Sequence, residues 1–356
     1  MTGYVLRRLG FGAIVIVVLT FVTFAVFRLI PYDPGYIVAG PRATPAELRA
    51  ADHRLGVDRT LWEQYGRFLW RLGHGDLGTS FTGLHLNAQM AATLPVTALL
   101  VAGGVLLMLA AALPLAVASA RRAGSGLDHV ILAVSVLGIA LHPFVVGVVL
   151  KQIFGVGLGV LPLGGYCPLH HVGPPRTPPP PSLGYLTPAQ WSAETHGGAT
   201  CSGAPWPWLW ASHMILPWLT FAFFFLPFYV RMLRTRLVES YAEPWVTVAR
   251  AKGASEVRIL VRHLLRAVAG TTVTMLALDI GTAVTAAIYV ETIYALPGLG
   301  HLALTALGAN SLTEAGYDLP TMAAIVLVVA AAIVVLNFLA DLVAARLDPR
   351  IRLGGR

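Results

Sequence analysis

Long apolar runs alternate along this chain with polar, basic or proline-rich stretches. Six runs have membrane-spanning length, roughly residues 9–30, 94–118, 127–150, 211–230, 269–290 and 322–343. A helix needs about 20 apolar residues to cross ~30 Å of hydrocarbon, and it tolerates the proline and glycine that some of these runs contain. The pattern predicts an all-α membrane protein with about six transmembrane helices.

Composition and charge agree with the hydropathy pattern. Hydrophobic residues make up 56% of the chain and charged residues only 12%, against about a quarter charged in soluble domains. With six spans and a cytoplasmic N-terminus, 16 of the 25 Lys and Arg lie on the cytoplasmic side, which follows the positive-inside rule. We therefore expect both termini in the cytoplasm. The net charge of +8 then follows from topology and does not indicate nucleic acid as a partner.

The first apolar run raises the question of a cleaved signal peptide. Arg7 and Arg8 precede it, but the run continues to about Ile30 and no small-x-small site closes it, so it is too long for a usual signal sequence. We expect residues 1–30 to remain as an N-terminal anchor helix. An extracytoplasmic loop over 31–93 and a core over 94–356 follow it.

Both cysteines, Cys167 and Cys201, fall in the segment 164–210, which the charge pattern places outside. They enclose 33 residues, and a disulfide that closes such a loop contributes roughly 3–4 kcal/mol in the chain-entropy model. An oxidising outer compartment favours the bridge, and two free thiols are the alternative. The nearby histidines match no standard zinc spacing, so no metal site is predicted.

Aromatic residues recur at about helical spacing in the outer segment 31–93, at Trp62, Tyr65, Phe68 and Trp70. One interpretation is a small cap whose aromatics pack on the membrane surface. The other is a docking surface for an outer partner. The two are compatible.

A basic, polar segment, Glu239–His263, separates the fourth and fifth runs on the cytoplasmic side. Pro244 stands where a first short helix would begin, Gly253 joins it to a second, and Ser255 can cap that second helix. Four residues of the first helix share one face by three-and-four spacing, namely Trp245, Val248, Ala249 and Lys252. Such a segment either docks a partner or lies on the anionic inner leaflet, and the residues alone favour neither.

No catalytic or nucleotide-binding motif interrupts this pattern. The sequence has no phosphate-binding Gly-x-x-x-x-Gly-Lys-Ser/Thr loop, no His-Glu-x-x-His and no nucleophile elbow, so we predict neither an enzyme nor a cofactor site in this chain. Asp279 lies near the middle of the fifth run, where a charge is costly. It is either a packing partner for a polar group on a neighbouring subunit or a residue of a solute pathway. Glu291 closes the same run and is expected to act there structurally or in gating.

Several short motifs, in one order along nearly the whole chain, carry a resemblance to a known family. They are Arg28-Leu-Ile-Pro-Tyr-Asp-Pro34, Leu55-Gly-Val-Asp58, Gly75-Asp-Leu-Gly-Thr-Ser80, Ala249-Arg-Ala-Lys-Gly253, Val290-Glu-Thr-Ile-Tyr-Ala-Leu-Pro-Gly-Leu-Gly300 and Leu347-Asp-Pro-Arg-Ile-Arg352. With these motifs the chain resembles the B-type permease subunit of dipeptide and oligopeptide ABC importers.

The resemblance implies a type I ABC importer permease fold in a bacterial inner membrane. It implies that the chain forms half of a translocation pathway for di- or oligopeptides. The implied partners are a second homologous permease, one or two cytoplasmic ATPase subunits that bind ATP and Mg, and an extracytoplasmic solute-binding protein. A nickel or glutathione importer of the same family is an alternative, as is a membrane scaffold or an intramembrane enzyme from another class.

The resemblance also assigns roles to residues. The segment 239–263 becomes a coupling loop seated on an ATPase. Asp279 and Glu291, selected by their place in the fifth run, stay candidate pathway residues. The residues expected at the ATPase contact are Trp245, Val248, Ala249, Lys252 and Gly253.

The chain departs from the family pattern at a few places. The segment 164–210 is longer than the corresponding loop, so it is expected to be an extracytoplasmic insertion. Thr247 and Val248 stand where the docking signature has glutamate and alanine. Pro244 is unusual there and is expected to shorten the first turn of the docking helix.

Overall fold

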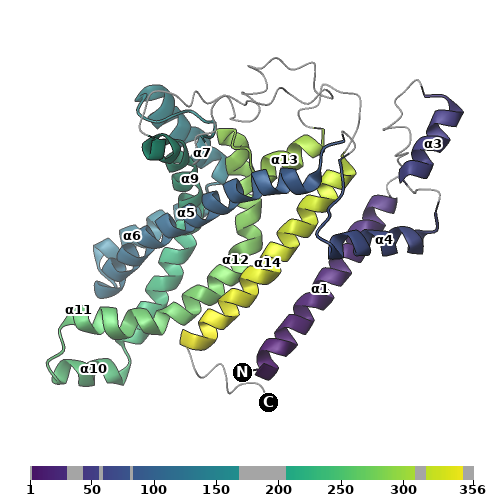
Figure 1. Ribbon diagram of the computed structural model, residues 1–356. Coiled ribbons are helices and arrows are strands. Elements are labelled where there is room, and N and C mark those ends of the chain that lie inside the picture. The colour runs from purple at the N-terminus through teal and green to yellow at the C-terminus, as the bar shows by residue number, and fades with distance from the viewer. Residues whose placement is uncertain are drawn as a thin grey trace. The chain divides into compact units, whose positions relative to one another are not determined.

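The computed structural model describes residues 2–29, 43–55, 59–80, 83–167, 206–308 and 318–347. In these residues all regular structure is helical apart from one isolated bridge between Thr79 and His85 (Figure 1). The helices are α1 (Thr2–Leu29), α3 (Pro45–Leu55), α4 (Leu61–Gly73), α5 (Leu86–Arg121), α6 (Gly126–Ile139), α7 (Pro143–Leu150), η1 (Lys151–Gly157), α9 (Trp206–Tyr241), α10 (Pro244–Ala251), α11 (Glu256–Ile259), η3 (Leu260–Leu264), α12 (Leu265–Tyr294), α13 (Leu299–Ala306) and α14 (Leu319–Leu347).

Four helices of the described chain are long and apolar enough to cross a membrane, or up to five if one bent pair is counted as a span. The four are Leu86–Arg121, Pro207–Tyr241, Glu256–Tyr294 and Leu319–Ala344. α1 has 28 residues, and its apolar part, Gly10–Val26, is shorter. The predicted helical membrane class is therefore confirmed.

The third predicted span, residues 127–150, consists of two helices and not of one continuous helix. The two helices that replace it, Gly126–Ile139 and Pro143–Gly157, are bent by 103° at the break between them. Pro143 begins the second, and Nδ1 of His142 accepts the N–H of Phe144 at 3.3 Å. Because proline cannot donate to the preceding turn and clashes with it, the chain starts a new helix here.

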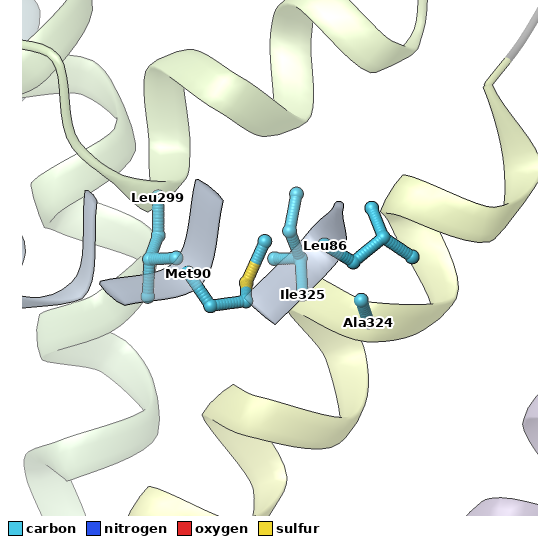
Figure 2. Packing of buried hydrophobic residues seen from close by; sticks show 5 residues of the cluster. All are labelled: Leu86, Met90, Leu299, Ala324 and Ile325. Atoms are coloured by element: carbon cyan, nitrogen blue, oxygen red, sulfur yellow. The ribbon is translucent and has the colours of Figure 1, made fainter. Parts of the chain in front are cut away.

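The described residues divide into two compact units, the first comprising residues up to 97 together with 297–334. Its core cluster joins Leu86 and Met90 from α5, Leu299 from α13, and Ala324 and Ile325 from α14 (Figure 2). These side chains are at most 7% exposed. Apolar burial therefore connects helices that lie far apart in the sequence.

The second unit comprises residues 98–167, 206–296 and those from 335. In it α9 packs against α6, α7 and α12. A Cβ atom on Gly103 of α5 would clash with Nε1 of Trp218, and one on Gly104 would clash with the ring of Phe221. Only glycine at these positions permits the close approach of α5 and α9.

Candidate functional site

Residues 239–263 contain two short helices, α10 and α11, joined by a tight turn. Pro244 occupies the first position of α10, where its missing N–H would have no helical partner in any case,. The hydroxyl of Ser255 caps α11 by accepting the N–H of Arg258 at 3.4 Å,. Both helices begin where the sequence predicts, so this local prediction is confirmed.

Gly253 ends α10 in a left-handed backbone conformation with φ of +76°. Its N–H donates to the carbonyl of Arg250 at 2.9 Å, and the N–H of Ala254 donates to the carbonyl of Ala249 at 3.1 Å. This pair of bonds is a Schellman motif. A Cβ atom at 253 would meet no atom of the described chain within 4 Å, so backbone conformation and not internal packing requires glycine here.

An ion pair braces α10 against α11. Nε of Arg250 lies 2.7 Å from Oε1 of Glu256, and Nη2 lies 3.4 Å from Oε2. The hydrogen bond that Arg250 donates to the carboxylate of Glu256 raises the pKa of Arg250. Both side chains are about half exposed, so the pair contributes little to stability, but it limits the orientation of the two helices.

The five residues predicted to contact an ATPase lie together on α10 and its turn, mostly facing outward. Trp245 and Val248 keep 38% and 52% of their surface exposed. Lys252 and Gly253 are also exposed, and Ala249 is partly buried. The structure therefore brings together the residues that the sequence selects.

The sequence did not show which apolar residues of segment 239–263 point inward. It also selected no residue of α11 as a candidate contact. Val246 and Ile259 are fully buried and attach the segment to the rest of its unit, while Val257 is 63% exposed. Helical spacing groups valines by face, but it does not say which face meets the chain's own core.

Asp279 has a polar partner inside the chain. The hydroxyl of Tyr229 on α9 donates to Oδ2 of Asp279 on α12 at 2.8 Å. Glu291, near the end of α12, is fully buried, and its carbonyl accepts the N–H of Leu296 at 2.9 Å. A pathway role for either acidic residue stays a prediction.

A buried carboxylate that the sequence analysis did not select connects three helices. Asp128, in the first turn of α6, accepts from Nε and Nη2 of Arg234 on α9 at 3.1 and 2.7 Å. The N–H of Gly124 donates to it at 2.8 Å, and Ser119 of α5 also donates to it. The available signal was local, since Ser125 and Asp128 have the Ser-x-x-Asp spacing of a helix cap,.

The cysteine prediction falls partly outside the described residues. Cys167 is 3% exposed, while Cys201 and the rest of 168–205 belong to the part of the chain that the structure does not describe. The bridge between Cys167 and Cys201 stays a prediction, as does the insertion 164–210.

Family models and known relatives match the chain along almost all of its length. The model described as a binding-protein-dependent transport system inner membrane component matches residues 112–353. The model of the N-terminal part of such membrane components matches residues 1–84.

Three relatives show the same extent of similarity. The di/tripeptide transport system permease protein of Pseudomonas aeruginosa is 30% identical over 99% of each chain. A probable D,D-dipeptide transport system permease protein of Escherichia coli is 31% identical over 99% of this chain and 98% of its own. The dipeptide transport system permease protein of Escherichia coli is 30% identical over 99% of each. With its apolar helices, the chain is thus a multi-pass inner-membrane protein, and it belongs to the family of inner-membrane components of binding-protein-dependent transport systems.

Proposed function

We propose that the chain is the permease subunit of an ATP-driven importer for di- or oligopeptides and forms half of its translocation pathway. The observation that carries the proposal is the similarity, over 99% of both chains, to permeases of dipeptide and di/tripeptide transport systems. A second homologous permease, one or two ATPase subunits and an extracytoplasmic binding protein complete the importer. ATP and Mg belong to the ATPase subunits.

The proposed topology has six spans with both termini in the cytoplasm. α1 supplies the span beyond the four long helices and the bent pair. The distribution of Lys and Arg on the short loops supports this orientation.

In this topology the segment 239–263 is a coupling loop that docks on an ATPase. The exposed apolar side chains of Trp245, Val248 and Val257 support docking, because a contact of this kind needs apolar anchors on a rigid helix. The closed turn at Gly253 and the brace from Arg250 hold that helix in place.

Asp279 is a candidate pathway residue in the same proposal. Its carboxylate, held by Tyr229, is suited to contact the ammonium group of a peptide. A charge inside the membrane region usually faces a cavity or a polar partner.

The test is uptake by the complete importer reconstituted in liposomes, with its binding protein and ATPases. ATP-dependent accumulation of a dipeptide, in preference to nickel and glutathione, is expected. Uptake of nickel or glutathione instead of peptide would replace the substrate assignment and leave the permease role intact.

A paired variant tests the docking step within that assay. Val248→Asp places a charge in the apolar contact and should abolish uptake while the chain still inserts in the membrane. Ala242→Asp adds the same charge at an exposed position just before α10 and should retain uptake. Equal uptake by the two variants contradicts the docking assignment.

A further inference from the structure

Helix α4 lies against α1 (Figure 1), and aromatic side chains make the contact. The ring centroid of Tyr65 lies 5.7 Å from that of Phe21 and 5.3 Å from that of Phe24, and the ring of Phe68 lies 6.2 Å from Phe24. The hydroxyl oxygens of Tyr65 and Thr20 are 3.2 Å apart. These contacts fix where along α1 the helix α4 lies.

The apolar side of α4 extends beyond this contact. Trp62 and Trp70 are 76% and 65% exposed, and their spacing of eight residues leaves them only about 80° apart around the helix. Glu63, Arg67 and Arg71 are exposed as well and form a polar side at about 100°, 140° and 180° from Trp62, next to Trp70 around the helix. α4 is therefore amphipathic, and its tryptophan-bearing face is not covered by the described chain.

The depth of α4 follows from its position on α1. The apolar part of α1 ends at Val26, and α4 contacts it between Thr20 and Phe24. At 1.5 Å per residue this contact lies within about 10 Å of the end of the apolar part. Amphipathic helices that lie on membranes are buried to a similar depth, at the boundary between headgroups and acyl chains.

The apolar surface is continuous from α1 onto α4. Phe21 touches Tyr65 and still exposes 47% of its surface, as does Val22 beside it. In the topology proposed above, on which this inference rests, α1 is a span and these exposed apolar residues lie in the hydrocarbon region. The lipid that covers α1 therefore extends to the exposed face of α4.

We propose that α4 lies in the membrane interface at the end of α1 and that Trp62 and Trp70 anchor it among phospholipid headgroups. Tryptophan is enriched at this depth because its ring is apolar and its N–H finds polar partners. The polar side with Arg67 and Arg71 then faces water. This assigns the tryptophans to lipid and not to a soluble outer protein.

The test uses the full chain labelled with fluorotryptophan in lipid nanodiscs, where Trp62→Phe and Trp70→Phe identify two of the eight tryptophan signals. A phospholipid spin-labelled near its headgroup should broaden these two fluorine signals, and a soluble gadolinium chelate should leave them sharp. Broadening by the chelate alone means that the face is open to water, and broadening by neither means that protein covers it. Either result overturns the proposal.

A second measurement does not depend on the phenylalanine variants. A photoreactive benzoylphenylalanine at position 62 or 70 should form adducts with phospholipid, detected by the mass of the chain. The same residue at position 71, which is exposed and lies about 180° from Trp62 and 100° from Trp70 around the helix, serves as the matched control and should form few. Adducts with another protein at 62 and 70, in membranes that contain the whole importer, contradict lipid anchoring.

Discussion

The ion pair between Asp128 and Arg234 joins residues that are 106 positions apart. The Asp128 side chain is 3% exposed and that of Arg234 is 22% exposed, so neither charge is fully solvated. Removing one partner of a buried pair is costly, because the other charge remains without compensation.

We therefore expect Asp128→Ala to lower the free energy of unfolding by about 3–5 kcal/mol. Thermal unfolding of the purified subunit in detergent measures the loss. Glu239→Ala is the matched control, because Glu239 pairs with Arg236 on the same helix while both are more than half exposed. Its effect should stay within about 1 kcal/mol, and equal losses for the two variants would show that Asp128 is not the critical partner.

The backbone of Gly253 gives a second prediction at the scale of one residue. A β-branched residue in the left-handed region is strained by about 1–2 kcal/mol, whereas asparagine tolerates this conformation. Gly253→Val should therefore reduce coupled uptake in the reconstituted importer, and Gly253→Asn should retain most of it. If both variants fail equally, the glycine is needed for close approach of a partner and not for its φ angle.

At the scale of the element, the limits of short helices could be predicted from residues that lie close together in the sequence. Pro244, Gly253 and Ser255 mark the limits of α10 and α11, because caps depend on neighbouring backbone groups. The bend at Pro143 was missed because proline is tolerated inside some membrane helices, including α9, which contains Pro217 and Pro227. Hydropathy alone does not distinguish the two outcomes.

The sequence pattern did not predict the contacts between helices. The burial of Val246 and the pairing of Asp128 each depend on a segment that is distant in the sequence. The periodicity of apolar residues does not identify such a segment. The residues of α10 that are candidates for the ATPase contact could be predicted, because they lie within one helix. The residues that hold this helix against the rest of the chain could not be predicted.

The approach of α5 to α9 is an element-scale property that a glycine comparison can test. Gly104→Ala places a methyl group against the fully buried Phe221 and should destabilise the isolated subunit by about 1–3 kcal/mol. Gly281→Ala on α12 meets nothing within 4 Å in the described chain and should be neutral or slightly stabilising, because alanine favours helix.

Unfolding midpoints of the two variants in detergent give the comparison. A stability of Gly104→Ala equal to that of the unsubstituted chain would mean that α5 and α9 are not so closely packed.

At the scale of the whole molecule, the proposed membrane topology predicts on which side of the membrane two reporter proteins lie. Six spans with cytoplasmic termini predict fluorescence from green fluorescent protein fused after residue 356. Alkaline phosphatase inserted within 168–205 should be active, because that loop is expected outside the cytoplasm. If only one of the two reporters is active, both sites lie on the same side of the membrane, which would contradict the three spans proposed between them.

The position of Arg234 within α9 has a mechanical consequence. α9 has 36 residues, and only Ala242 and Glu243 separate it from α10. Arg234 is seven residues from the end at Tyr241 and 28 from the start at Trp206, or about 10 Å and about 42 Å along the axis. For a rigid tilt of α9 about its ion pair to Asp128, a displacement of about 1 Å beside α10 would correspond to about 4 Å at the other end of the helix.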